Sequence, residues 1–324
     1  MKYFITGGTG SLGKALIKRI LESDIKNTVT VYSRDEGKQA NSFKGNPRIK
    51  CVIGDVRDFH KLNTSMAIHR PDYVIHAAAL KRVDDMEFYP DECVKTNVTG
   101  SENVANASML NGVKKCMLVS TDKACQPVNV YGSSKFIAER IFTNCDYNSN
   151  GTIFASVRYG NVIASRGSFI PMWMGALNKG ETIRITSPEM TRFLFTLGDA
   201  VDTVLNALYN CEGGEVFVPQ INSYKITSVF EACKVLTNQA EANGEIVGLR
   251  PGEKMHEDML SKTELPYTYK VDDLNLLCIR PQYTNRNHNK TWERYDGLEF
   301  NSGLHVSDDL DQLVELVHRG VSET

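Results

Sequence analysis

The stretch Thr6-Gly7-Gly8-Thr9-Gly10-Ser11-Leu12-Gly13 decides the fold. It follows a short apolar run, 2–6, and precedes a segment, 12–21, whose apolar residues recur at helical spacing. Residues without side chains are needed where backbone N–H groups and a helix N-terminus approach a pyrophosphate. A plain tight turn is the alternative. We therefore expect a dinucleotide to be bound by Gly7, Thr9, Gly10, Ser11, Leu12 and Gly13.

The first half of the chain alternates strand and helix patterns. Short runs rich in Val and Ile predict strands at 2–6, 28–32, 49–53, 73–76, 115–119 and 153–157. Helical patterns lie between these runs. This alternation predicts an α/β fold, a doubly wound parallel (Rossmann) sheet with helices on both faces. Ligands of such folds bind beyond the carboxyl ends of the strands.

The regular alternation of strand and helix patterns ends at Gly167, after which prolines, glycines and short segments are frequent. The helical pattern at 199–210 is expected to return to the sheet. We therefore expect two parts, which we describe by their residue ranges. The dinucleotide-binding domain takes residues 1–166 plus about 193–218, and a smaller C-terminal substrate-binding lobe takes residues 167–192 plus about 219–324.

The last helix is predicted from a capping residue and from spacing. Ser307 precedes Asp308 and Asp309, and this order favours an N-cap at Ser307 with two acidic residues in the first turn. Apolar residues then recur at the spacing of one buried helical face. They are Leu310, Leu313, Val314 and Val317.

Composition excludes several classes of protein. The 324 residues include 37 basic and 39 acidic ones, a formal net charge of −2, which argues against a nucleic-acid or anionic-membrane binder. No apolar run approaches the ~18 residues needed to cross a bilayer. Eight cysteines without a C-x-x-C pair are expected to be mostly buried thiols, and neither they nor the seven histidines predict a metal site. We expect a cytoplasmic protein without a bound metal.

The end of the second predicted strand bears on the choice of dinucleotide. NAD-binding folds place a carboxylate there for the ribose 2′-hydroxyl. Here Ser33 takes that place and Arg34 follows, which suits the 2′-phosphate of NADP. NADP is therefore favoured over NAD, although Asp35 keeps NAD open. Further contacts are expected beside the adenine and from small side chains that let the cofactor pack closely: Asp55, Val56, Ala77, Ala78, Ala79 and Val162. Simple helix–sheet packing is the alternative for the alanines.

Tyr131 and Lys135 are the strongest candidates for catalysis. Their four-residue spacing places both side chains on one face of a predicted helix. A neighbouring ammonium lowers the pKa of a tyrosine and so makes it a better base near neutral pH. The pair follows a predicted strand that ends in Val119-Ser120-Thr121, so we expect it beside the cofactor as well.

The glycine turn combined with this Y-x-x-x-K pattern resembles the extended short-chain dehydrogenase/reductase superfamily, in its form that modifies nucleotide sugars. Within it, Thr121-Asp122-Lys123 resembles the inverting UDP-N-acetylglucosamine 4,6-dehydratases that begin pseudaminic acid synthesis, whereas retaining dehydratases carry Thr-Asp-Glu. The resemblance covers residues 1 to about 260. A related branch carries Met in place of Tyr131. Departures from the family pattern at Arg82, Asp84, Leu194 and Tyr224 concern substrate preference.

The resemblance implies transient oxidation at C4 of the sugar, loss of water across C5 and C6, return of hydride to C6 and inversion at C5. Tyr131 would take the proton of the 4-hydroxyl, whose oxygen Thr121 would hydrogen-bond. Lys123, if neutral, would abstract the C5 proton, and Asp122, if protonated, would donate to the leaving 6-hydroxyl. Desolvation would have to lower the pKa of Lys123. A surface ion pair is the alternative for Asp122 and Lys123.

The resemblance also implies substrate contacts and a partner. Lys81 and Asn161 are expected near the sugar or phosphates, Arg192 and Arg250 on the pyrophosphate, and Glu253 on a nucleotide hydroxyl. Any one arginine is as easily structural. A UDP-sugar is the expected substrate and a homo-oligomer the expected state. Three other functions stay open: a nucleotide-sugar 4-epimerase, a keto-reductase, and an NADP-sensing regulator without catalysis.

Overall fold

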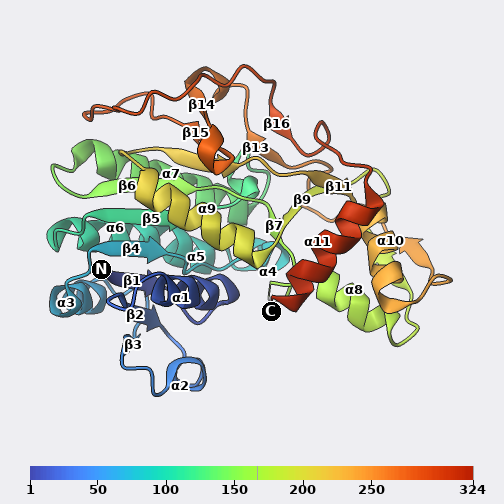
Figure 1. The fold of residues 1–324 in the computed structure, drawn as a ribbon, viewed down its shortest axis with the longest axis horizontal. Helices are drawn as coiled ribbons and strands as arrows, with labels where there is room; N and C mark the ends of the chain where they lie inside the picture. Colours follow the sequence, from blue (N-terminus) through green and yellow to red (C-terminus); the bar gives the residue numbers. More distant parts are fainter. Residues whose placement is uncertain (166, 324) are drawn as a thin grey trace.

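The structure is a computed structural model that describes residues 1–165 and 167–323. Nine strands form the large sheet: β1 (Lys2–Thr6), β2 (Thr28–Ser33), β3 (Ile49–Ile53), β4 (Tyr73–His76), β5 (Lys115–Val119), β6 (Ile153–Val157), β10 (Val216–Pro219), β14 (Thr268–Val271) and β15 (Leu276–Ile279). Their order is β14-β15-β10-β6-β5-β4-β1-β2-β3 (Figure 1). Neighbours from β3 to β10 pair in parallel, whereas β15 is antiparallel to both β10 and β14.

Helices cover both faces of this sheet. α1 (Ser11–Ser23) packs beside α9 (Leu197–Asn210) on one face, and α3 (Phe59–His69), α6 (Gly100–Leu110) and α7 (Val130–Asn148) pack side by side on the other. Two apolar cores fill the space between the sheet and these helix layers. Burial on both faces explains why the parallel strands read as nearly continuous apolar runs. The doubly wound Rossmann sheet is confirmed, with all six predicted strands at their expected places.

A second group of helices lies beyond the carboxyl ends of the parallel strands (Figure 1). α10 (Ile226–Thr237) packs against α8 (Phe169–Leu177) and α11 (Leu310–Ser322) around an apolar core of their own. Three small sheets accompany them: β7 (Asn161–Val162), β9 (Thr191–Phe195) and β11 (Ser223–Lys225); β8 (Ile183–Ile185) and β12 (Gly244–Ile246); β13 (Asp258–Leu260) and β16 (Phe300–Asn301).

Short helical segments lie mostly near strand ends. They are α2 (Glu36–Phe43), α4 (Val83–Phe88), α5 (Pro90–Cys93), the π-helix η1 (Val94–Thr99), and the 3₁₀ turns η2 (Asp122–Ala124), η3 (Leu265–Tyr267) and η4 (Asp272–Leu274). The division into two domains stays a proposal. β14 and β15, from the range expected for the substrate-binding lobe, join the large sheet, and the boundary residues 166 and 324 lie outside the described residues.

The last helix begins later than expected. Asp309, and not Ser307, is its N-cap, because the Asp309 carboxylate accepts the N–H of Gln312 at 2.9 Å. The N–H of Ser307 donates to the Ser223 carbonyl at 2.8 Å, so the backbone there follows β11 instead of turning into a helix. Leu313 and Val317 are fully buried as predicted, whereas Leu310 is exposed.

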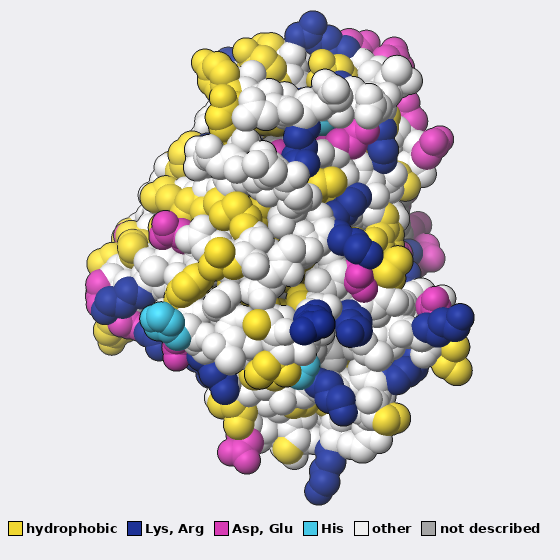
Figure 2. Space-filling model, turned by 90° about the vertical axis from the view of Figure 1, so that its left-hand side faces the viewer, with side chains coloured by type: hydrophobic (Ala, Val, Ile, Leu, Met, Phe, Trp, Pro, Cys, Tyr) yellow, Lys and Arg dark blue, Asp and Glu magenta, His cyan; other side chains and the backbone are white. Residues whose placement is uncertain are grey.

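The cysteines, the helices and the surface agree with the composition. The eight cysteines are free thiols and six of them are buried, as expected. Among the described residues, no helix is long and apolar enough to span a membrane, and no group of three or more His, Cys, Asp or Glu side chains is placed to hold a metal ion. Basic, acidic and apolar side chains are mixed on the side where the parallel strands begin (Figure 2).

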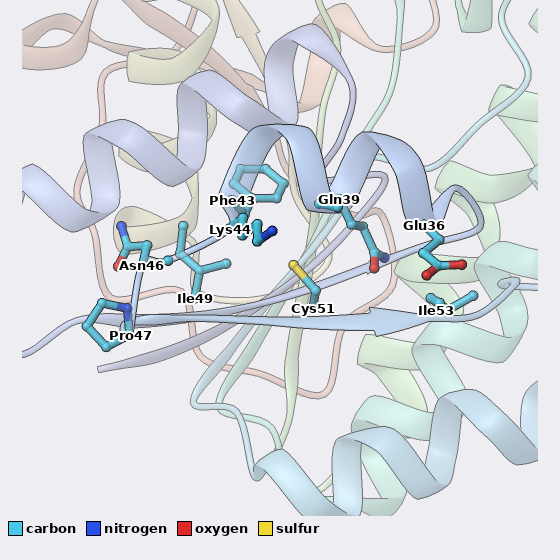
Figure 3. Close-up of a pocket in the computed structure, with 11 residues that line it drawn as sticks. Glu36, Gln39, Phe43, Lys44, Asn46, Pro47, Ile49, Cys51 and Ile53 are labelled. Atoms are coloured by element: carbon cyan, nitrogen blue, oxygen red, sulfur yellow. The ribbon is translucent and has the colours of Figure 1, made fainter.

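A pocket lies between α2 and the edge strand β3 (Figure 3). It is lined by apolar side chains such as Phe43, Ile49 and Ile53, and by Cys51. The candidate catalytic residues do not line it, because they lie at the carboxyl ends of β5 and on α7 in the middle of the sheet. The candidate active site therefore lies at the carboxyl ends of the strands and not in this pocket.

Candidate active site

The glycine-rich turn between β1 and α1 forms a cradle that excludes side chains. Gly7 has a positive φ of 70°, and a Cβ there would lie 2.8 Å from the Ala78 Cα. A Cβ on Gly13 would lie 2.5 Å from the Gly8 Cα. Gly10 is the N-cap of α1 and has no side chain to cover the helix N-terminus. A close turn at an uncovered helix N-terminus fits a pyrophosphate.

The end of β4 lies against this turn. The N–H of Ala77 donates to the Thr6 carbonyl at 3.2 Å, and that of Ala78 donates to the Thr6 hydroxyl at 3.3 Å. Asn97, on η1, bonds both backbone groups of Leu80 at 2.8 and 3.0 Å and donates to the Ser134 hydroxyl on α7 at 3.0 Å. The structure therefore brings the small residues after β4 together with the glycine turn and with α7.

The residues after β2 lie where the ribose of a bound dinucleotide is expected. Arg34 is largely exposed, and its guanidinium lies 3.9 Å from the Asp55 carboxylate. Asp35 caps α2 by accepting the N–H of Lys38 at 2.9 Å. The Ser33 hydroxyl accepts from Gln39 at 2.9 Å. Asp35 is thus engaged within the protein, whereas the Arg34 side chain extends into solvent. Val56 is buried in the adjoining core.

Tyr131 and Lys135 lie in the first turns of α7, which Asn129 caps by accepting the N–H of Gly132 at 2.7 Å. The Lys135 ammonium is buried and donates to the Val119 carbonyl at 2.6 Å, at the end of β5. Burial lowers the pKa of Lys135 to about 8. Burial also raises the pKa of Tyr131 to about 12, against the opposing charge of Lys123. The largest lowering effect on this tyrosine therefore comes from Lys123, not from Lys135 as expected from the sequence.

Asp122 and Lys123 form a buried ion pair in η2, directly after β5. The Asp122 Oδ1 atom accepts three hydrogen bonds: from the Thr121 hydroxyl at 2.8 Å, from the Lys123 N–H at 2.9 Å and from the Lys123 Nζ at 3.0 Å. The Asp122 Oδ2 atom is buried and has no hydrogen-bond partner among the described residues. The side chain of Asp122 is 1% exposed and that of Lys123 is 19% exposed. This pair lies in the interior and not on the surface.

Glu257 is a further member of this group that the sequence analysis missed. Its Oε1 atom lies 3.2 Å from the Lys123 Nζ, and its side chain is 3% exposed. It lies just before β13, three residues after the Arg-Pro-Gly-Glu-Lys string that ends at Lys254. An acidic residue next to a histidine in a loop has no distinctive spacing, so only the fold reveals it.

The second carboxylate changes the expected charge of Lys123. Burial by itself lowers the pKa of this lysine, but the charges of Asp122 and Glu257 raise it well above its ordinary value, against the opposing charge of Arg192. The expected lowering of the Lys123 pKa is therefore wrong for the protein alone. Lys123 is an ammonium held between two carboxylates, and it has to give up a proton before it can act as a base.

The two arginines expected to bind the substrate come from β9 and from the loop before β13. Arg192 is buried on β9 and donates to the carbonyls of Thr191 and Lys254 at 2.7 and 3.0 Å. Its guanidinium also lies 3.3 Å from Glu253. Arg250 is exposed and bonds Glu253 at 2.9 Å and Asp84, on α4, at 3.1 Å. The structure thus brings Arg192, Arg250 and Glu253 together. Through Asp84, Arg250 links them to α4, the helix that follows β4.

Three candidate residues lie at the borders of the site. Lys81 is exposed just after β4. Asn161 and Val162 form β7, which pairs in parallel with β9 through Leu194 and Phe195. β7 therefore lies beside the strand that carries Arg192. The candidate residues therefore lie near the carboxyl ends of the parallel strands, on β7 and β9, or in the loop between β12 and β13.

The glycine cradle, the tyrosine and lysine on α7 and the buried acid and amine after β5 belong together in one class of protein, the extended short-chain dehydrogenases/reductases. A family model described as polysaccharide biosynthesis protein matches residues 3–278. The chain belongs to this family.

Relatives and solved structures narrow the comparison. A Campylobacter jejuni protein named UDP-N-acetylglucosamine 4,6-dehydratase (inverting) is 43% identical over 86% of this chain and 82% of its own length. A Rickettsia massiliae protein named UDP-glucose 4-epimerase is also 43% identical, over 83% of this chain and 80% of its own length. The X-ray structure of Pen from Bacillus thuringiensis is 30% identical, with a TM-score of 0.89 over 98% of this chain and 97% of its own.

Proposed function

We propose that the chain is a nucleotide-sugar 4,6-dehydratase that inverts C5. It converts UDP-N-acetylglucosamine to a UDP-2-acetamido-2,6-dideoxy-hexos-4-ulose. The name of the Campylobacter jejuni relative supports the reaction and the substrate. The observation that carries the proposal is the buried pair of Asp122 and Lys123, 3.0 Å apart. Loss of water across C5 and C6 needs a base at C5 and an acid at the 6-oxygen, and this pair offers an amine and a carboxyl at one point.

The same pair argues against a 4-epimerase, the name of the Rickettsia relative. Epimerisation at C4 needs a base for the 4-hydroxyl, which Tyr131 supplies, and a dinucleotide. It does not need a second acid and base. An acid, an amine and a further carboxylate buried without function would lower the stability of the protein, because charged groups are costly to bury.

A nicotinamide dinucleotide fits the residues present. The turn from Gly7 to Gly13 and the alanines after β4 form a cradle that added Cβ atoms would fill. A dinucleotide held there would supply a reversible hydride acceptor for the oxidation at C4 and the reduction at C6. NADP is proposed over NAD because Arg34 is the exposed cation after β2, whereas Asp35 is occupied as the cap of α2.

The chain's own residues then divide the proton transfers. Tyr131 takes the proton of the 4-hydroxyl, and the ammonium of Lys123 offsets part of the cost of its phenolate. Thr121 orients the 4-oxygen. Lys123 removes the C5 proton, and Asp122 donates to the leaving 6-hydroxyl through Oδ2, the oxygen without a protein partner. Burial of this group excludes the water that would otherwise compete for these protons.

Lys81, Asn161, Arg192, Arg250 and Glu253 are proposed to bind the UDP-sugar. Arg250 would exchange its contacts with Asp84 and Glu253 for the pyrophosphate. A homo-oligomer and a place at the start of pseudaminic acid synthesis remain predictions from the resemblance, and a cytoplasmic location remains a prediction from composition.

Proton NMR of the reaction mixture tests this function. With UDP-N-acetylglucosamine and NADP⁺, the wild-type protein is expected to form a product with a 6-methyl signal. Asp122→Asn is expected to lower the rate at least 100-fold, because the amide cannot donate a carboxyl proton. Asp91→Asn, an exposed substitution on α5, is the control and keeps the wild-type rate. A wild-type product that retains its 6-hydroxymethyl group would contradict the proposal.

A further inference from the structure

Glu257 reaches the catalytic group from a distant part of the chain. Its side chain is buried, and its Oε1 atom lies 3.2 Å from the Lys123 Nζ. Its backbone is held on both sides by Ser302: the Glu257 N–H donates to the Ser302 hydroxyl at 2.8 Å, and the Ser302 N–H donates to the Glu257 carbonyl at 2.8 Å. Thr191, next to Arg192 on β9, bonds the same Ser302 hydroxyl at 2.7 Å. The position of Glu257 is therefore rigidly fixed.

Two carboxylates share one ammonium in this group, and each has an oxygen left over. The Oε2 atom of Glu257 and the Oδ2 atom of Asp122 are both buried without a hydrogen-bond partner among the described residues. Buried acceptors without donors are rare because they lose their hydration without replacement. The group therefore has two buried acceptor oxygens, one on each carboxyl side chain, whose hydrogen-bonding capacity the described residues do not fill.

Lys123 is surrounded by charged or titratable groups from four elements. Asp122 lies on its own turn, Glu257 precedes β13, Arg192 comes from β9 and Tyr131 from α7. Only Asp122 and Glu257 lie within ion-pair distance of the ammonium among the described residues. Any change in the charge of Glu257 must therefore act on Lys123 directly.

We propose that Glu257 is a positioning residue of the dehydration, which holds the Lys123 amine beside Asp122 while one proton passes from the ammonium to the Asp122 carboxyl. This inference rests on the proposed function. Without Glu257, that transfer would leave a neutral amine with no acceptor to orient it. With Glu257, a fixed carboxylate oxygen stays 3.2 Å from the Lys123 Nζ and orients the nitrogen in both protonation states.

The proton balance of the elimination follows from this arrangement. The resting group carries one proton on the amine and none on the carboxylates, and transfer to Asp122 keeps that total. The C5–H bond then breaks as the proton moves to the Lys123 amine. Its electron pair forms the C5–C6 double bond, the C6–O bond breaks, and the Asp122 proton leaves with the oxygen as water. Glu257 remains a carboxylate throughout and gains or loses no proton.

The test measures the pH dependence of kcat for Glu257→Gln. The Glu257 charge raises the pKa of Lys123, so its removal lowers that pKa. The acid limb of the profile should therefore move to lower pH, by about one unit or more. We expect kcat to fall about 10- to 100-fold at neutral pH, because the amide no longer holds the amine. KM should change less than threefold, since Glu257 does not touch the substrate.

Two further variants separate positioning from folding. Glu257→Asp keeps the charge and is expected to keep the acid limb at its wild-type pH while losing part of kcat. Asp258→Asn changes the next carboxylate, which pairs with Lys254, and should leave both kcat and the limb unchanged. If the wild-type protein dehydrates the sugar but the acid limb of Glu257→Gln stays at its wild-type pH, the role of Glu257 is overturned and the proposed function stands. Absence of a 6-methyl product from the wild-type protein would overturn the proposed function, and this inference with it.

Discussion

At the scale of single residues, the chemistry depends on where charges are placed after β5. Asp122 and Lys123 are adjacent in the chain, and a strand end followed by a 3₁₀ turn brings both side chains into the interior. Burial alone lowers the pKa of this lysine. Two carboxylates keep it charged in the protein without ligands, which implies that substrate binding and proton transfer, and not the resting protein, create the base.

The choice of dinucleotide is also decided at single residues. Arg34→Ala is expected to weaken NADPH binding at least tenfold and to leave NADH binding within twofold, because only NADPH has a 2′-phosphate for the guanidinium. Dissociation constants for both cofactors, measured by fluorescence titration, check this. Arg82→Ala, which removes an exposed arginine paired with Asp85, is the control. Equal losses of affinity for NADPH and NADH would show that Arg34 does not bind the 2′-phosphate.

Sequence patterns predicted these residues unevenly. Asp122, Lys123, Tyr131 and Lys135 could be proposed from the sequence because each belongs to a short string with fixed spacing, and residues close in sequence stay close in the fold. Glu257 lies more than a hundred positions from Lys123 and meets it only because β13 packs beside η2. Its effect on the pKa of Lys123 was therefore invisible, and the expectation of a lowered pKa failed for that reason.

At the scale of elements, the glycine turn shows how the sheet builds the cofactor cradle. Gly7→Ala is expected to lower the free energy of unfolding by about 1–3 kcal/mol, because the residue has a positive φ and its Cβ would strike the backbone of Ala78. Dinucleotide binding should be lost as well. Gly45→Ala has a similar φ but open space around it, so it serves as the control and should cost about 1 kcal/mol without loss of binding.

Chemical denaturation and cofactor titration of the two variants check this prediction. Equal stability losses and intact binding in both variants would mean that strain alone, and not the close approach of β4, governs the turn.

Three elements are joined by a buried charge network. Arg158, at the end of β6, bonds Glu139 on α7 at 2.7 Å and Glu264, just before η3, at 2.9 Å. Although burial opposes it, the charge of Arg158 holds the pKa of Glu264 at about 2, below its ordinary value of 4.5. Because the folded-state pKa is lowered, this carboxylate stabilises the fold above pH 4.5 and loses that contribution as the pH falls towards 2.

Glu264→Gln tests this link. We expect it to lower the free energy of unfolding at pH 7 by about 3 kcal/mol, and the difference from the wild type should shrink between pH 4.5 and 2. Glu231→Gln changes an exposed carboxylate that pairs with Lys234, and it should change stability by less than about 0.5 kcal/mol at either pH. Urea unfolding as a function of pH gives both values. A difference that stays constant down to pH 2 would mean that Glu264 is not held ionised by Arg158.

Helices and strands were predicted correctly where residues close in sequence determine them. The six parallel strands are buried on both faces, so their apolar runs mark them at their expected places. The start of the last helix was misplaced because Ser307 and Asp309 are both good caps. The pairing of Ser307 with Ser223, far away in the chain, decides between them.

At the scale of the whole molecule, the two proposed ligands approach from different parts of the structure. NADP⁺ is assigned to the glycine turn and β2, and UDP to the arginines of β9 and the loop before β13. Each ligand alone should therefore raise the melting temperature by a few degrees at 100-fold excess over its dissociation constant, which corresponds to about 2.7 kcal/mol. Differential scanning fluorimetry with NADP⁺, UDP and cytidine 5′-diphosphate as a control checks this. A protein stabilised by NADP⁺ but not by UDP would contradict the placement of the nucleotide.

The most direct measurement of the central claim follows one hydrogen through the reaction. UDP-N-acetylglucosamine carrying deuterium at C4 is incubated with the wild-type protein and NADP⁺, and the product is examined by NMR and mass spectrometry. If the buried carboxyl and amine expel water while the sugar is oxidised, the deuterium appears in the C6 methyl group of a product that has lost 18 mass units (about the mass of one water). Deuterium that remains at C4 of a product with unchanged mass would contradict the account.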